Sequence, residues 1–171
     1  GAQPWALTPE AYGKFLCGLF DVYYRDWVNG DYTSVRLFDD YIHMAMGMPA
    51  GTCATSGSCG AYFVVEGDGT VYPCDFYCLD EWEMGRIGEQ SIPELANSEK
   101  ARLFLQQGER KPDACADCRW YSLCHGGCKR DWVENDGKLE NYSCLAFKEF
   151  FAYAESRILE IARAEAEYYR R

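Results

Sequence analysis

The residues most able to do chemistry in this sequence are its ten cysteines. Four of them fall within the short segment 115–128, which reads CADCRWYSLCHGGC. Reduced thiolates at such close spacings are typical ligands of zinc ions and iron–sulfur clusters. In order along the chain, the cysteines are Cys17, Cys53, Cys59, Cys74, Cys78, Cys115, Cys118, Cys124, Cys128 and Cys144.

Length and charge narrow the possible functions. A chain of 171 residues can bury enough apolar surface to fold without staples, so the cysteines indicate chemistry rather than reinforcement. The formal net charge of −10 would repel phosphate backbones, and we expect no nucleic-acid partner. No apolar run reaches the roughly 20 residues of a membrane span and no leader is evident. We therefore expect a cytoplasmic protein with reduced thiols and no membrane partner.

Helices are predicted at both ends and in the middle of the chain. Thr8 followed by a proline begins an amphipathic helix that should end near Gly30. Ser91 and Glu94 form a capping box for a helix of about four turns. After Cys144, apolar residues recur at helical spacing, which predicts a long terminal helix that frays at its end.

Short strands are predicted between these helices, so the expected fold class is α+β. Residues 33–48 suggest a short strand followed by a helix. Two β-rich runs flank Gly67-Asp68-Gly69, a strong hairpin signal. This hairpin would hold Cys59 at one end and Cys74 at the other, so local structure would bring the two thiols near each other.

The spacing of the thiols alone is compatible with several kinds of site. A single C-x2-C pair is found in zinc ribbons, redox dithiols and iron–sulfur sites alike. The full set can supply two centres of four thiolates each, either zinc sites or clusters, and a secreted chain would form disulfides instead. Gly126 and Gly127 let the backbone turn tightly, so that amide groups can point at cluster sulfurs.

The complete pattern resembles a known family. It runs C-x9-G-x4-C from Cys59 to Cys74, then C-x2-C-x5-C-x3-C, then a final cysteine. This resembles the SPASM domain, the C-terminal auxiliary-cluster domain of many radical S-adenosylmethionine enzymes. More narrowly, residues 57–87 and the CHGGCKRD segment at 124–131 are similar to anaerobic sulfatase-maturating enzymes. The likeness extends over residues 8–151.

The resemblance implies a domain division and a larger protein. Residues 1–50 would be linker helices and a short strand that join a missing radical SAM barrel. Residues 51–146 would form the two-cluster SPASM domain, organised as a hairpin and cysteine-rich loops, and residues 147–171 a C-terminal helix. The chain starts with Gly-Ala rather than Met, which fits our expectation of a C-terminal fragment.

The resemblance also implies two [4Fe-4S] clusters. Cys128 would leave its sequence neighbours to join the first cluster, which ties the hairpin to the C-terminal segment. Cys17 and Cys78 match no ligand position and are expected to be packed or free thiols, with Cys78 an alternative ligand. The first cluster would be held by Cys53, Cys59, Cys74 and Cys128, and the second by Cys115, Cys118, Cys124 and Cys144.

Asp75 is the candidate catalytic residue. The resemblance implies that it removes the proton of a substrate thiol or hydroxyl, and we expect the nearby cluster to raise its proton affinity. The alternative is an Asx-turn that supports the Cys74 loop. His125 is expected to donate a hydrogen bond near a cluster, and His43 to be an ordinary helix residue. We expect surface charges at Asp80, Glu81 and Asp131, and shielding of the clusters by Trp82, Trp120, Tyr121 and Trp132.

The chain is not expected to be catalytic alone. It has no C-x3-C-x2-C motif, so S-adenosylmethionine and a third [4Fe-4S] cluster would belong to the missing N-terminal domain. The resemblance implies that the whole enzyme oxidises a Cys or Ser of a sulfatase peptide to Cα-formylglycine, with an auxiliary cluster accepting an electron. The alternatives are the SPASM domain of another peptide-modifying maturase, or a non-catalytic electron-transfer or zinc-binding module.

Overall fold

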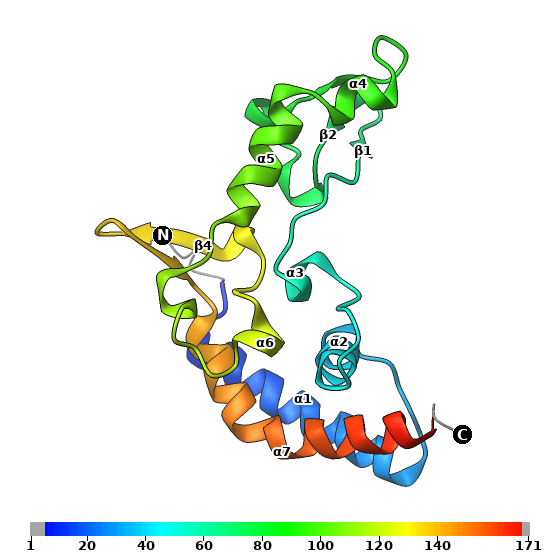
Figure 1. Ribbon diagram of the computed structural model, residues 1–171, viewed down its shortest axis with the longest axis vertical. Coiled ribbons are helices and arrows are strands. Elements are labelled where there is room, and N and C mark those ends of the chain that lie inside the picture. The colour runs from blue at the N-terminus through cyan, green and yellow to red at the C-terminus, as the bar shows by residue number, and fades with distance from the viewer. Residues whose placement is uncertain (1–5, 169–171) are drawn as a thin grey trace. The chain divides into compact units, whose positions relative to one another are not determined.

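The structure is a computed structural model that describes residues 6–168 (Figure 1). The chain divides into two compact units, which we describe separately. The first combines residues 1–56 with residues 112–171, so its halves are far apart in the sequence. The second is the continuous segment 57–111. As predicted, the fold class is α+β, with helices and small antiparallel sheets.

Three helices build the first unit: α1 (Pro9–Asn29), α2 (Arg36–Ala45) and α7 (Cys144–Tyr168). Figure 1 shows α1 and α7 side by side along most of their lengths. Their facing sides bury one continuous apolar core, to which α2 also contributes. The largest fully buried side chains of this core are Tyr41, Phe20, Phe38, Phe150, Phe151, Leu16, Ile158 and Ile161.

Aromatic rings lock the three helices together. Phe20 of α1 meets Phe38 of α2 edge to face, with ring centroids 5.0 Å apart, and meets Phe150 of α7 in the same way at 5.5 Å. Phe38 and Phe150 are stacked at 5.4 Å. Such pairs contribute about 0.5–1.5 kcal/mol each beyond the burial of their surface. The start of α7 is therefore fixed in position relative to the other two helices.

Local sequence signals set the helix ends. The Thr8 hydroxyl accepts from the Ala11 amide at 3.2 Å, and Gly30 takes the left-handed conformation with φ 81°, so the predicted helix is confirmed. The terminal helix is confirmed as well, and the predicted fraying lies partly outside the described residues. The short strand expected before α2 is not formed, because residues 31–35 have no neighbouring strand to pair with.

Several short elements complete the first unit. The hairpin of β4 and β5 turns at Asp136-Gly137, where both residues have positive φ. We did not predict it, although an Asp-Gly pair is a hairpin signal. The bounds are α3 (Cys53–Ser56), η3 (Asp113–Cys115), α6 (Tyr121–Cys124), η4 (Lys129–Asp131), β4 (Trp132–Asn135) and β5 (Lys138–Asn141).

The second unit contains the predicted hairpin, extended by one strand. Its antiparallel order is β1-β2-β3. Asp68 in the turn accepts from the Thr70 amide at 2.9 Å and pairs with Arg86 of β3 at 2.9 Å. We did not predict β3, because its two residues form a strand only through their pairing with β2, which lies well before them in the sequence. The bounds are β1 (Val64–Val65), β2 (Thr70–Tyr72), η1 (Asp75–Tyr77), η2 (Asp80–Trp82) and β3 (Gly85–Arg86).

Two helices replace the single four-turn helix predicted in this unit. They are α4 (Ile92–Ala96) and α5 (Glu99–Glu109). The capping box of Ser91 and Glu94 is present as predicted. A second cap follows at once, since the Ser98 hydroxyl accepts from the Ala101 amide at 3.1 Å and starts a new helix. Across residues 6–168, no helix is both long and apolar enough to cross a membrane.

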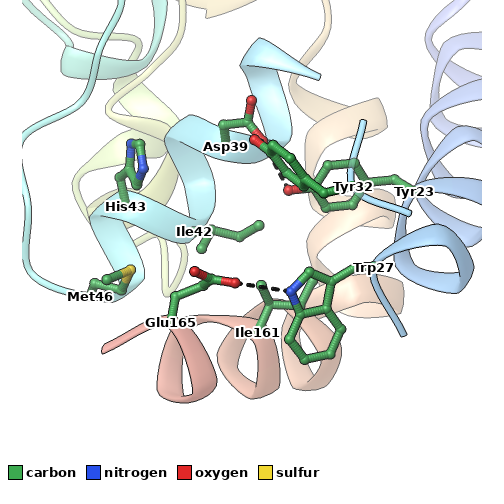
Figure 2. Close-up of a pocket in the computed structure, with 9 residues that line it drawn as sticks. All are labelled: Tyr23, Trp27, Tyr32, Asp39, Ile42, His43, Met46, Ile161 and Glu165. Carbon is green, nitrogen blue, oxygen red and sulfur yellow. Dashed lines mark hydrogen bonds between the residues drawn. The ribbon is translucent and has the colours of Figure 1, made fainter. Parts of the chain in front are cut away.

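A pocket of about 170 Å³ opens between α1, α2 and α7 (Figure 2). His43 of α2 lines it. Asp39 accepts from the hydroxyls of Tyr23 at 2.9 Å and Tyr32 at 3.0 Å, and Glu165 accepts from an indole of α1 at 3.1 Å. Both carboxylates are thus already paired with aromatic side chains, and their bonds tie the three helices together.

Asp40 fastens the segment that carries Cys53 to α2. Its carboxylate, 3% exposed, accepts from the Gly51 amide at 2.9 Å and from the hydroxyls of Thr52 at 2.8 Å and Thr55 at 2.5 Å. Burial acts to raise the pKa of Asp40, but these hydrogen bonds outweigh burial and leave the pKa below its usual value. The ionised form is therefore the one that holds this segment.

Replacing Asp40 should weaken the first unit. Asp40→Asn leaves at least one of the three donors poorly paired, which should lower the free energy of unfolding by about 1–3 kcal/mol at neutral pH. A carboxylate whose pKa is lower in the folded than in the unfolded protein stabilises the fold at pH values above its unfolded pKa of about 3.9. This stabilisation is lost as the pH falls through the folded pKa. Denaturant unfolding should therefore show the stability of wild type approaching that of the variant as the pH falls below about 4.

The partly exposed carboxylate of Asp26, which pairs with the exposed Arg25 at 3.0 Å, supplies the control. Asp26→Asn should change the free energy of unfolding by about 0.5 kcal/mol or less. Equal stability of wild type and Asp40→Asn at neutral pH would contradict the role of Asp40.

Candidate metal centre

Four cysteines from separate elements of the first unit line one cavity. Cys115 ends η3, Cys118 follows in the next loop, Cys124 ends α6 and Cys144 begins α7. These are the four residues that the resemblance assigns to the second cluster. Apolar parts of the cavity wall come from Ala114, Trp120, Phe147 and Phe151.

Tight turns bring three of these cysteines together. The Cys118 amide donates to the Cys115 carbonyl at 3.3 Å. After Cys124 the backbone takes three left-handed residues in a row, His125, Gly126 and Gly127, with φ of 50°, 88° and 68°. A Cβ on the last of them would lie 2.7 Å from the amide nitrogen of Asn141. The predicted glycine turn is therefore present, and glycine is required there for space as well as for conformation.

Asn141 links this turn to the fourth cysteine. It is 7% exposed, its Nδ2 donates to the Gly126 carbonyl at 2.8 Å, and its Oδ1 accepts from the Ser143 amide at 2.7 Å. The residue thus fixes the chain just before Cys144 against the turn just after Cys124. Our sequence reasoning missed Asn141, because nothing local distinguishes it from a surface amide.

The cavity disfavours ionised thiols unless positive charge is supplied. Burial raises the pKa of Cys124 to about 11, the Gly126 amide opposes this, and the thiolates of Cys115, Cys144 and Cys118 raise it further. Burial also raises the pKa of Cys144, although Lys148 opposes it. Metal binding needs thiolates, so a cationic group must displace the protons from these four sulfurs.

The residues present fit an iron–sulfur cluster. Four thiols and an apolar wall surround the site, and the buried indole Nε1 of Trp120 on that wall has no hydrogen-bond partner. Cluster sulfurs accept hydrogen bonds from donors of this kind. Within residues 6–168, no group of three or more His, Cys, Asp or Glu side chains is placed to hold a single metal ion.

The other four predicted ligands are divided between the two units. Cys53, on α3, and Cys128 belong to the first, while Cys59 and Cys74 belong to the second. In the first unit, Cys128 lines a pocket together with Ala54, the neighbour of Cys53. The quartet as a whole stays a prediction.

In the second unit, the two predicted ligands Cys59 and Cys74 are closely packed by neighbouring groups. A Cβ on Gly108 of α5 would lie 2.8 Å from the Cys59 sulfur, so the helix approaches this thiol to a distance that only glycine allows. Cys74, 7% exposed, follows β2. Gly108 was not recognised in the sequence, because a glycine inside a helical pattern gives no sign of what it contacts.

Asp75 lies beside Cys74 and points a carboxylate oxygen at two donors. Its Oδ1 accepts from the Tyr62 hydroxyl at 2.7 Å and from the Cys74 thiol at 3.3 Å. These bonds, the one from Tyr62 foremost, lower the pKa of Asp75. The protein groups around Asp75 thus lower its proton affinity, because the carboxylate is exposed and hydrogen-bonded, and the raised affinity that we expect from the nearby cluster stays a prediction.

The remaining candidates lie mostly as expected. Cys17 packs against the core of the first unit, and the Cys78 thiol donates to the Cys74 carbonyl at 3.8 Å. His125 Nδ1 donates to the Thr55 carbonyl at 2.8 Å, next to the segment that carries Cys53. Asp131 is not a simple surface charge, since it is half-buried and burial raises its pKa.

The four aromatic residues expected to shield the clusters divide into two groups. Trp120 and Tyr121 line the cysteine cavity. The Trp132 indole donates to the Gly126 carbonyl at 2.8 Å, at the edge of the glycine turn. Trp82 instead packs in the second unit against Phe104, at a centroid distance of 5.6 Å. Asp80 and Glu81 are exposed, as expected.

Comparison with known proteins gives one family match. Residues 57–119 match SPASM, an iron–sulfur cluster-binding domain. The chain is 40% identical over 164 residues to a cysteine-type anaerobic sulfatase-maturating enzyme of Clostridium perfringens strain 13, covering 95% of this chain and 44% of the relative. It is 29% identical over 155 residues to a serine-type enzyme of Bacteroides thetaiotaomicron, covering 87% of this chain and 36% of the relative.

Solved structures agree with these relatives. The structure of native anSMEcpe with bound AdoMet and the Kp18Cys peptide matches with a TM-score of 0.88 and 40% identity. The match covers 96% of this chain and 46% of that one. The chain thus spans less than half the length of the relatives that it matches. Residues 57–119 therefore match the SPASM iron–sulfur cluster-binding domain, and nearly the whole chain is similar to part of the anaerobic sulfatase-maturating enzymes.

Proposed function

We propose that the chain is the auxiliary-cluster part of a radical S-adenosylmethionine enzyme that oxidises a sulfatase cysteine to Cα-formylglycine. The observation that carries the proposal is the convergence of Cys115, Cys118, Cys124 and Cys144 on one cavity, in a chain related to sulfatase-maturating enzymes. Cysteine is favoured over serine as the target, since identity is 40% to a cysteine-type relative and 29% to a serine-type one.

Two [4Fe-4S] clusters are part of the proposal. The first-unit cavity would hold one through its four cysteines, and the other would join Cys53 and Cys128 to Cys59 and Cys74. When bound, such clusters supply one-electron redox chemistry. We retain 51–146 as the two-cluster region between the linker 1–50 and the helix 147–171. The binding of S-adenosylmethionine and a third cluster would belong to the barrel domain of the same protein, which we place in the cytoplasm.

Within this chain, Asp75 is the residue proposed to take the substrate proton. Its carboxylate is exposed and is held by the Tyr62 hydroxyl at 2.7 Å. An aspartate of ordinary pKa, about 3.9, is ionised at neutral pH, so this carboxylate can accept a proton. A cysteine thiol, with a usual pKa of about 8.5, gives up its proton far more readily than a serine hydroxyl does. A carboxylate base therefore suits a thiol substrate better than a hydroxyl substrate.

Removing one ligand should remove one cluster. In the full-length protein purified anaerobically, Cys124→Ala should lower iron and sulfide by the content of one cluster, because the Cys124 thiol is a wall of the four-cysteine cavity. Cys17→Ala is the matched control, since its thiol packs against the helical core, and should leave both contents unchanged. Zinc in place of iron in the wild-type protein would favour the zinc-binding alternative and end the proposal.

Removing the carboxylate of Asp75 should stop turnover without removing iron. Asp75→Asn in the full-length enzyme should lower kcat by about 10²–10⁴-fold, because an amide cannot take the substrate proton. The mass change of a sulfatase peptide containing the target cysteine measures the reaction. Asp80→Asn, which changes an exposed carboxylate of η2, should retain full activity.

Two results would redirect this interpretation. Unchanged turnover of Asp75→Asn would return Asp75 to a turn-forming role. A wild-type enzyme that carries clusters but leaves sulfatase peptides unmodified would favour the alternative of a maturase for another peptide.

A further inference from the structure

Within residues 6–168, the indole Nε1 of Trp120 is the only buried side-chain nitrogen or oxygen without a hydrogen-bond partner. Other tryptophan indoles in the first unit have acceptors: Trp27 donates to Glu165 at 3.1 Å, and Trp132 donates to the Gly126 carbonyl at 2.8 Å. Buried donors without a partner are rare in folded proteins and call for an explanation.

The ring of Trp120 is held on several sides. It stacks on Phe151 of α7 at a centroid distance of 6.3 Å. The guanidinium carbon of Arg119 lies 4.8 Å from the ring centroid, and that guanidinium donates to both carboxylate oxygens of Glu155 at 2.8 and 3.1 Å. The Trp120 carbonyl also accepts from the Cys124 amide at 3.0 Å. These contacts fix the indole and leave it little freedom to turn its N–H to solvent.

Trp120 lines the cavity that is formed by the four cysteines. The side-chain amide of Asn141 on the same wall is already used, since Nδ2 donates to Gly126 and Oδ1 accepts from Ser143. Trp120, which lines the same cavity, therefore offers a buried donor that the protein itself leaves unused.

We propose that the indole N–H of Trp120 donates a hydrogen bond to a sulfur of the cluster held by Cys115, Cys118, Cys124 and Cys144. This inference rests on the proposed function, because it needs that cluster. Trp120 acts as a positioning residue that tunes the cluster and does not touch the substrate. A hydrogen bond to sulfur offsets negative charge, so it stabilises the reduced form and raises the reduction potential.

The test compares reduction potentials of the full-length, cluster-loaded protein by anaerobic redox titration. Trp120→Phe keeps an aromatic ring for Phe151 and Arg119 but removes the donor. It should lower the potential of one cluster and leave the others unchanged. At a fixed potential, the oxidised-to-reduced ratio of that cluster should rise by roughly three- to tenfold, tenfold being 59 mV for a one-electron couple. The control Trp27→Phe removes an indole that pairs with Glu165 and should shift no potential.

A second replacement separates the donor from the shape of the ring. If Trp120→Phe loses iron, 3-benzothienylalanine at position 120 keeps the two-ring shape and replaces only the N–H by sulfur. The same downward shift with full iron content supports the proposal. Unchanged potentials at full iron content overturn this inference alone, whereas a wild-type protein without iron overturns the proposed function as well.

Discussion

Four thiols in one partly apolar cavity are the constraint on which the rest of this structure depends. Burial, reinforced by repulsion from neighbouring thiolates, raises the pKa of Cys124 to about 11, so this thiol resists ionisation unless a cationic group joins it. The proposed iron–sulfur cluster would supply that charge and displace the protons. The free energy of binding then becomes part of the free energy of folding, as in other small metalloproteins.

The long helix α7 (Figure 1) makes this cavity possible. Phe150 lies against Phe20 and Phe38 in a fixed aromatic cluster, and Cys144 is the first residue of the same helix. A thiolate at a helix N-terminus is stabilised by the helix dipole. The apolar core and the four-cysteine cavity therefore share the helix α7. The core is built from segments at the two ends of the chain, so these distant segments together form the first unit.

In the second unit, a short hairpin and one tyrosine position both a candidate ligand and the candidate base. One hairpin turn sets the register of β1 and β2, and Cys74 and Asp75 follow the end of β2 directly. The Tyr62 hydroxyl contacts both Asp75 and the Cys74 sulfur, at 2.7 and 3.6 Å. A candidate ligand and the candidate base thus share one side chain as support, so a change at Tyr62 would disturb both.

Much of this architecture follows from the sequence by itself. Capping residues, proline and glycine predicted the position of α1 and the start of α4. The Gly-Asp-Gly turn predicted the hairpin, and the cysteine spacing indicated the metal-binding family. All of these are local signals, since each depends on residues a few positions apart. The split between α4 and α5 was misjudged even though Ser98 carries a local cap signal, because the apolar pattern continued through it.

Only the tertiary structure decided which distant groups meet. Asn141 joins two segments that carry cysteines, Gly108 makes room for the Cys59 sulfur, and the Trp120 indole is left without an acceptor. None of these roles has a local pattern, because each arises from contacts between elements distant in the chain. Spacing could therefore identify the thiols, while the donors and close approaches around them were set by how the helices pack.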